Sequence, residues 1–159
     1  MFHLIPQPLH RAVLPLAHRV RHHWRVWRKV PLAGCGVVIC NLEGDVLLLR
    51  HSYGPRVWAL PGGGIKPGEE AEIALRREVQ EELRIELGRV TLVTVIADEV
   101  SGSPHTTHLF AATTDQHPQI DRREVVEARF FPRHSLPEPQ GERTRARLDA
   151  WRAFLQGDG

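Results

Sequence analysis

The sequence predicts a single mixed α/β domain that follows a basic N-terminal segment. Its 159 residues are 42% hydrophobic and 25% charged, which suits one globular core. Short runs with strand character and two longer runs with helical spacing follow one another along residues 31–159. Residues 1–30 instead combine an apolar stripe with basic side chains. We therefore expect two parts, 1–30 and 31–159, with the fold in the second.

The N-terminal segment has helical periodicity. Leu16, Val20, Trp24 and Trp27 recur at spacings of four, four and three, and residues 1–42 carry six Lys and Arg side chains and no carboxylate. We expect the apolar stripe to pack on its own domain or on a second copy of the chain, which would give a homodimer. Contact with an anionic membrane surface or with nucleic acid, and an organellar transit peptide, are the alternatives.

Neither a membrane span nor a secretory signal is expected. No apolar run approaches the ~20 residues that cross a bilayer, and prolines and basic residues interrupt the early apolar positions. Cys35 and Cys40 lack the spacing of a zinc or redox motif, which favours two small core residues in a reducing compartment. We therefore expect a cytoplasmic protein.

Five segments after residue 31 have strand character, and turn-forming residues separate them. The expected strands are Leu32–Cys40, Val46–Arg50, Val90–Val100, His105–Thr113 and Val125–Phe131, all rich in apolar or β-branched residues. Asn41–Asp45 predicts a hairpin-like turn between the first two strands, and residues 101–104 predict another turn. His51–Pro61 predicts an irregular link.

Two segments have helical spacing. One helix is expected from about Glu69 to Leu83, and a closing helix over Glu138–Leu155. Three apolar residues of the closing helix share one face: Leu148, Trp151 and Leu155.

Three carboxylates crowd one patch of the first helix. At 100° per residue, Glu78 and Glu82 lie one turn apart, and Glu81 lies on the adjoining flank. Like charges at this spacing repel, so the patch is destabilising without a counter-ion. Glu78 and Glu82 extend the stripe that Ala74 and Leu75 begin, and inward carboxylates need paired cations or metal. Oxygen ligands favour Mg²⁺ or Mn²⁺, and a solvated Glu-rich face is the alternative.

Three successive glycines precede this helix. Gly62, Gly63 and Gly64 allow the backbone to approach a ligand or metal closely and to adopt conformations closed to other residues. Glu69 and Glu70 lie near the helix start, where negative charge suits the helix dipole. A glycine run by itself is most often a turn, but beside the carboxylates it favours phosphate chemistry.

Together these residues resemble the Nudix box. That motif runs Gly, five residues, Glu, seven residues, Arg-Glu-apolar, one residue, Glu-Glu, one residue, Gly-apolar. The residues in register with it are Gly63, Glu69, Arg77, Glu78, Val79, Glu81, Glu82 and Ile85. Arg84 stands where the family has its last glycine. It either adopts the left-handed conformation that ends the helix or lets the helix run on toward Gly88.

The resemblance implies an α/β fold of the Nudix type, an α/β/α sandwich with a mixed β-sheet. It also implies bound Mg²⁺, with Mn²⁺ as the alternative. The implied metal ligands are Glu78, Glu81, Glu82 and a backbone carbonyl near Gly62 or Gly63. Glu69 and Arg77 would pair with each other and orient the helix.

The implied reaction is Mg²⁺-dependent attack of water on the diphosphate bridge of a nucleoside diphosphate derivative or a related organic diphosphate. Glu78 or Glu82 is the expected general base, because both belong to the box. A later carboxylate, Glu124 or Glu127, is the second choice. For these two, a surface pair beside a strand is an equally good interpretation.

Residues just before the glycine run are candidates for binding the substrate. We expect Arg50, His51 and Arg56 to bind the substrate, since arginine can bind a phosphate, and Tyr53 offers a ring that can stack on a base. For each of these residues taken singly, a surface or packing role is the alternative. Trp58 is expected to be a packing residue beside the box.

Two other functions are open. One is a Nudix-fold module that binds a ligand or regulates without turnover, and the other is a pyrophosphohydrolase acting on RNA 5′ ends, which rests on the basic leader. Otherwise nucleic acid is not an expected partner. The intact Arg-Glu-x-x-Glu-Glu spacing favours catalysis, because a module that only bound ligand would not need the whole carboxylate cluster.

Overall fold

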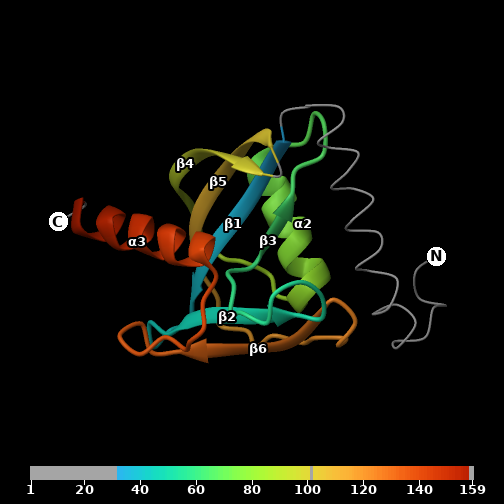
Figure 1. Ribbon diagram of the computed structural model, residues 1–159. Coiled ribbons are helices and arrows are strands. Elements are labelled where there is room, and N and C mark those ends of the chain that lie inside the picture. Colours follow the sequence, from blue (N-terminus) through green and yellow to red (C-terminus); the bar gives the residue numbers. More distant parts are fainter. Residues whose placement is uncertain (1–31, 101, 158–159) are drawn as a thin grey trace.

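The computed structural model describes residues 32–100 and 102–157. The basic segment 1–30 and its expected helix lie outside the described residues. The elements in chain order are β1 (Leu32–Cys40), β2 (Val46–His51), β3 (Gly62–Gly64), α2 (Ala71–Leu83), β4 (Val90–Val100), β5 (Ser103–Thr113), β6 (Val125–Phe131) and α3 (Glu142–Gly157) (Figure 1).

The six strands form one mixed sheet. Its order is β4-β5-β1-β2-β6, and β3 pairs with β1 beside this path. β1 and β5 run parallel from the pair Leu32–His105 to the pair Cys40–Thr113, whereas the other paired strands are antiparallel. A parallel pair needs a long crossover. Here the crossover from β1 to β5 contains β2, β3, α2 and β4. The candidate motif therefore lies, in the sequence, between two central strands of the sheet.

The two helices cover opposite faces of the sheet (Figure 1). Val37 and Ile39 of β1 belong to the buried cluster that contains Leu75 of α2. Val38, between them, belongs to the cluster that contains Leu148 of α3. Successive side chains of a strand point to opposite faces, so one apolar run fills two cores. The expected α/β/α sandwich with a mixed sheet is confirmed.

Most predicted strand bounds are confirmed, and the differences have local causes. β1, β4 and β6 have the predicted bounds, and β2 runs one residue further. β5 begins at Ser103, because Ser103 and Pro104 pair with Val100 and Glu99 instead of forming a turn. No strand was predicted for the glycine run, but it forms the short strand β3, which pairs with Gly34–Gly36.

Both helices begin later than predicted. α2 begins at Ala71, because residues up to Gly68, with φ +77°, form a turn. α3 begins at Glu142 and ends at Gly157, because the residues just before it pair with Trp58: the amide of Trp58 donates to the carbonyl of Pro139, and the amide of Gly141 donates to the carbonyl of Trp58. In α3, Leu148 and Trp151 are buried as predicted, but Leu155 is 45% exposed.

The end of α2 decides between the two expectations for Arg84. The helix ends at Leu83, and Arg84 has φ 54° and ψ 38°, the left-handed conformation. Its amide donates to the carbonyl of Gln80 at 3.0 Å, which closes the last turn. Gly88 bonds instead to Thr113 of β5. Arg84 therefore occupies the strained terminal position that a glycine would fill without strain.

Two further expectations concern the cysteines and the membrane. Cys35 and Cys40 are free thiols, Cys35 buried in the core and Cys40 partly buried. Across the residues the structure describes, neither helix has the length and apolar character needed to cross a bilayer.

Candidate active site

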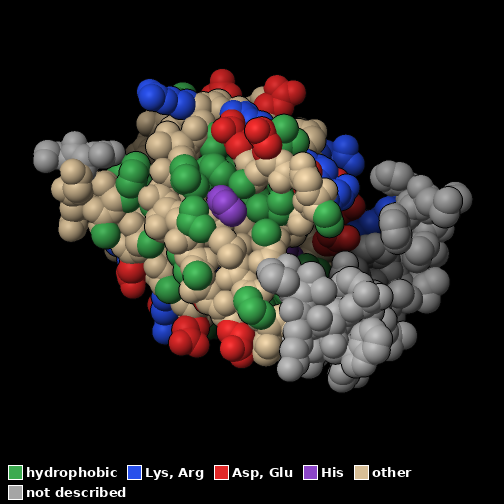
Figure 2. Space-filling view, turned by 90° about the horizontal axis from the view of Figure 1, so that it is seen from above, with side chains coloured by type: hydrophobic (Ala, Val, Ile, Leu, Met, Phe, Trp, Pro, Cys, Tyr) green, Lys and Arg blue, Asp and Glu red, His purple; other side chains and the backbone are tan. Residues whose placement is uncertain are grey.

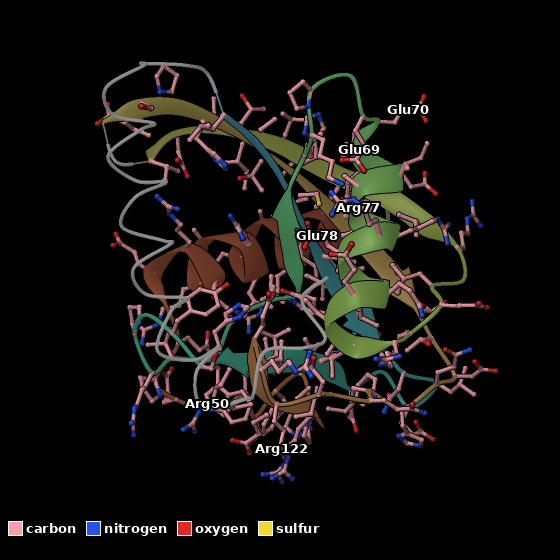
Figure 3. All side chains as sticks on the ribbon, turned by 90° about the vertical axis from the view of Figure 1, so that its right-hand side faces the viewer. Arg50, Glu69, Glu70, Arg77, Glu78 and Arg122 are labelled. Atoms are coloured by element: carbon pink, nitrogen blue, oxygen red, sulfur yellow. The ribbon has the colours of Figure 1, made fainter. Side chains whose placement is uncertain are left out.

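One guanidinium ties the loop before α2 to the helix. Arg77 Nε and Nη2 donate to the two carboxylate oxygens of Glu69 at 2.9 and 3.0 Å, and Nη2 also donates to the carbonyl of Gly64 at 3.1 Å. Nη1 donates to Glu78 at 2.7 Å. The bond from Arg77 holds the pKa of Glu69 down to about 2. The expected pairing of Glu69 and Arg77 is thus present, and Figure 3 shows Glu69, Arg77 and Glu78 along one side of α2.

The glycines of β3 allow the strand and the helix to meet. A side chain at position 63 would run into the carboxylate of Glu78, and a side chain at position 62 would run into the carbonyl of Cys35. Gly62 also has φ +153°. The backbone of Gly62 hydrogen-bonds to the carboxylate of Glu82. Gly63 therefore allows α2 to approach β3 closely, and Gly62 allows β3 to lie against β1.

Glu82 is the most perturbed acid of the site. Burial raises its pKa to about 8, and the charges of Glu78, Glu124 and Glu81 add to the shift. Its Oε2 is buried and has no hydrogen-bond partner among the described residues. Burial also raises the pKa of Glu78, although Arg77 opposes the shift. These directions fit a cluster of like charges withdrawn from water.

The other two expected acids lie further out. Glu81 has a side chain that is 62% exposed, 3.7 Å from Arg77. Glu124 is exposed just before β6, yet its charge raises the pKa of both Glu78 and Glu82. Within the described part of the chain, no three Asp, Glu, His or Cys side chains are gathered into a ready-made metal cage. The expected ligands Glu78, Glu81 and Glu82 therefore share a helix without converging on one point.

The donor set nevertheless suits a hard divalent cation. Glu82 offers a buried oxygen that lacks a partner among the described residues, and Glu78 lies close enough to raise its pKa. All these donors are carboxylate oxygens, the ligand type of Mg²⁺ and Mn²⁺. A cation at this point would offset the burial of the two carboxylates and the repulsion from neighbouring acids, which together raise the two pKa values.

The three residues expected to bind substrate lie together. Arg50, His51 and Arg56 line one cavity of about 400 Å³ with Ser52, Arg122 and Val126. Arg122 was missed by the sequence analysis. It lies far along the chain from the others, and no motif marks it. The pairing of β2 with β6 brings it to them.

Two lining residues of this cavity, His51 and Ser52, are connected to the carboxylate cluster through Glu124. His51 hydrogen-bonds to the backbone carbonyl of Glu124, and the amide of Ser52 donates to the same carbonyl at 2.8 Å. Burial lowers the pKa of His51, so its ring is neutral at neutral pH. Glu124 thus contacts the cavity through its backbone and the box glutamates through its charge.

Two other candidates, the aromatic Trp58 and the acidic Glu127, have structural partners. Trp58 is buried, packs edge-on against Phe131 and lies under the guanidinium of Arg50, which agrees with its expected packing role. Glu127 lies 3.7 Å from both Arg50 and Arg129 on the surface of β6. The ion pairs of Glu127 favour the surface interpretation for this residue.

Comparison with known proteins agrees with this fold and site. The profile of the NUDIX domain matches residues 30–152. A MutT NUDIX hydrolase from Burkholderia pseudomallei is 30% identical, with a TM-score of 0.68 over 76% of this chain and 98% of that one. An Ap4A hydrolase from C. elegans, solved as a binary complex, is 26% identical, with a TM-score of 0.64 over 79% and 98%.

A mixed sheet between two helices, with a glycine strand against a glutamate-bearing helix, defines the class. The chain belongs to the Nudix hydrolase family. It is also 54% identical over 48 residues to an RNA pyrophosphohydrolase of Serratia proteamaculans, a match that covers 30% of this chain and 27% of the relative. An RNA pyrophosphohydrolase of Klebsiella pneumoniae is 52% identical over 48 residues, with the same coverage. The matched stretch thus spans about a quarter of the length of these curated relatives.

Proposed function

We propose that the chain hydrolyses the diphosphate bridge of a nucleotide derivative or related organic diphosphate with the help of Mg²⁺. The observation that carries this proposal is the buried oxygen of Glu82, which has no partner among the described residues and lies beside a second acid, Glu78. A purely structural helix gains nothing from two repelling acids on its inner face. A cation that accompanies a diphosphate would give the buried oxygen of Glu82 a partner.

The box residues have distinct roles in this proposal. Glu78, Glu81 and Glu82 would hold the cation with a carbonyl near Gly63, while Arg77 keeps Glu78 in place. When bound, such a cation neutralises diphosphate charge and lowers the pKa of a bound water.

The proton acceptor would be one of three acids. Glu82 or Glu78 is the proposed general base, because both belong to the box and lie beside the proposed cation. Glu124, whose charge reaches both of them, is the second choice.

The substrate would extend from the carboxylate cluster into the cavity beside β2. Arg50, His51 and Arg56 would bind its phosphates there, since all three line the cavity and Glu124 joins the two regions. An RNA 5′ end is the second candidate substrate, supported by the similarity to RNA pyrophosphohydrolases. A cytoplasmic location and a homodimer stay predictions.

Activity is tested by a substrate screen in which both products are identified. We would incubate the protein and Mg²⁺ with nucleoside diphosphate sugars, dinucleoside polyphosphates, nucleoside triphosphates and 5′-triphosphorylated RNA. The expected result is cleavage of a diphosphate bridge that EDTA abolishes and excess Mg²⁺ restores. Tight binding of a nucleotide without cleavage under any of these conditions would instead show a binding module.

A further inference from the structure

The cavity beside β2 has a basic lining. Three arginines, Arg50, Arg56 and Arg122, line it together with His51, Ser52 and Val126, and none of the described lining residues is an acid. Arg50 does lie 3.7 Å from Glu127, but both side chains are more than a third exposed, so that pair is weak. Guanidinium groups around one cavity repel each other, and a bound anion relieves the repulsion.

Arg122 reaches the cavity from a turn with an uncommon backbone conformation. Its φ is +62°, a left-handed value that strains a non-glycine residue. The turn is held from two sides. The amide of Arg123 donates a hydrogen bond to the side chain of Asp121 at 2.9 Å, and the hydroxyl of Ser52 donates to the carbonyl of Arg123 at 2.5 Å. Backbone strain that neighbours hold in place is typical of ligand sites.

The cavity adjoins the carboxylate cluster without being part of it. Figure 3 shows Arg50 and Arg122 beyond the C-terminal end of α2, while Glu78 lies midway along the helix. Glu124 connects the two regions, because its carbonyl bonds to His51 and Ser52 and its charge acts on Glu78. A diphosphate held at the cluster would therefore need a further charged group to fill the basic cavity.

We infer that this cavity binds a phosphate beyond the two that the scissile bond joins, so that the substrate carries at least three linked phosphates. This inference rests on the proposed function for the position of the scissile bond. A sugar hydroxyl pairs best with acids and amides, and the described lining of the cavity has neither. A phosphate pairs with guanidinium groups through two parallel hydrogen bonds, so the three arginines of the lining are its expected partners.

Binding of inorganic phosphates tests the cavity directly. Triphosphate and pyrophosphate would each be titrated calorimetrically into the full chain with Mg²⁺, because the carboxylate cluster can hold a diphosphate only through a cation. Both anions would be recovered afterwards to check that neither was cleaved. Arg122→Ala should weaken triphosphate binding about tenfold and pyrophosphate binding less than about threefold, because one charge-assisted contact is lost. Arg89→Ala is the matched control, since Arg89 is an exposed arginine outside this cavity, and it should change neither.

A second variant separates the effect of the Arg122 side chain from the effect of the backbone strain. Arg122→Gly removes the same guanidinium and also relieves the left-handed strain, so it should fold at least as stably as the wild type and show the same binding defect. If both variants bind triphosphate as tightly as the wild type, or lose triphosphate and pyrophosphate equally, the inference is overturned.

Kinetics distinguish failure of this inference from failure of the proposed function. With Mg²⁺, Arg122→Ala should raise KM for a nucleoside triphosphate about tenfold with kcat within about threefold, and leave a nucleoside diphosphate sugar unaffected. Arg122-dependent triphosphate binding in a protein that cleaves nothing would remove the proposed function and keep the cavity's assignment. Cleavage of nucleoside diphosphate sugars without any binding of triphosphate would keep the proposed function and remove the cavity's assignment.

Discussion

Glu69 and Glu82 belong to one motif but lie in opposite environments. Glu69 receives two hydrogen bonds from Arg77 and one from the amide of Lys66, and its pKa is held down to about 2. Glu82 is buried beside Glu78, one of its oxygens has no partner among the described residues, and its pKa is raised to about 8. A glutamate at one end of the motif is thus a fully hydrogen-bonded anion, whereas a glutamate at the other end is in surroundings that disfavour its charged form.

This contrast separates structural from chemical roles. A carboxylate that an arginine already binds on both oxygens has little capacity for another cation. A carboxylate without a counter-ion is destabilising in the free protein and gains most when a cation arrives. We therefore assign Glu69 to the positioning of α2, and we place Glu82 in the proposed chemistry.

The sharpest test exchanges each acid for its amide. Glu82→Gln should lower kcat at least 10²-fold, because the change removes a proposed metal ligand while keeping size. Glu69→Gln should lower kcat by about tenfold, as expected for a residue that only orients ligands. Steady-state kinetics with Mg²⁺ measure both. Glu86→Gln, at an exposed glutamate beyond the helix, is the control and should retain full activity. Full activity of Glu82→Gln would contradict the assignment.

The stability of the metal-free protein should respond to pH through Glu82. With a folded pKa near 8 against an ordinary value of 4.5, the acid loses its proton first in the unfolded chain. The folded state is therefore penalised progressively as pH rises from 4.5 to 8, at about 1.4 kcal/mol per pKa unit. Glu82→Gln removes the penalty. Urea melts should show the variant roughly a few kcal/mol more stable at pH 8 and equal to the wild type at pH 4.5.

Glu69 should show the opposite pH dependence. Its pKa is lowered to about 2, so its contribution to stability is present above its ordinary pKa of 4.5 and is lost as pH falls through 2. Glu69→Gln should therefore be less stable than the wild type at neutral pH, and the difference should shrink in acid. Urea melts over the pH range 7 to 2 provide the measurement. A constant difference across that range would show that the ion pair with Arg77 is not its source.

The smallest expected effect concerns the end of the helix that carries these acids. Because Arg84 holds the left-handed position, Arg84→Gly should raise stability by a few tenths to ~1 kcal/mol. Arg84→Ala keeps the strain and should not stabilise. Denaturant melts measure the sign, and kcat should be unchanged in both variants. A loss of stability in Arg84→Gly would mean that the side chain of Arg84 contributes more than the strain costs.

The parts of the site that follow helical periodicity were predictable. The inward position of Glu78 and Glu82, and the choice at Arg84 between a left-handed end and a longer helix, depend on geometry within two turns of one helix. That one oxygen of Glu82 is buried without a partner among the described residues was not predictable, because it depends on how β3 and β1 pack against the helix. Glycine has a poor strand propensity, so the strand β3 was also missed.

The sequence by itself determined the Nudix box and the family, because both are carried by residue types at short, fixed spacings. Only the tertiary structure decided that Arg122 shares a cavity with Arg50, and that Glu124 touches the wall of that cavity. The physical reason is strand pairing. β2 and β6 lie far apart in the chain, and their backbone hydrogen bonds leave no pattern in the arginines and acids they bring together.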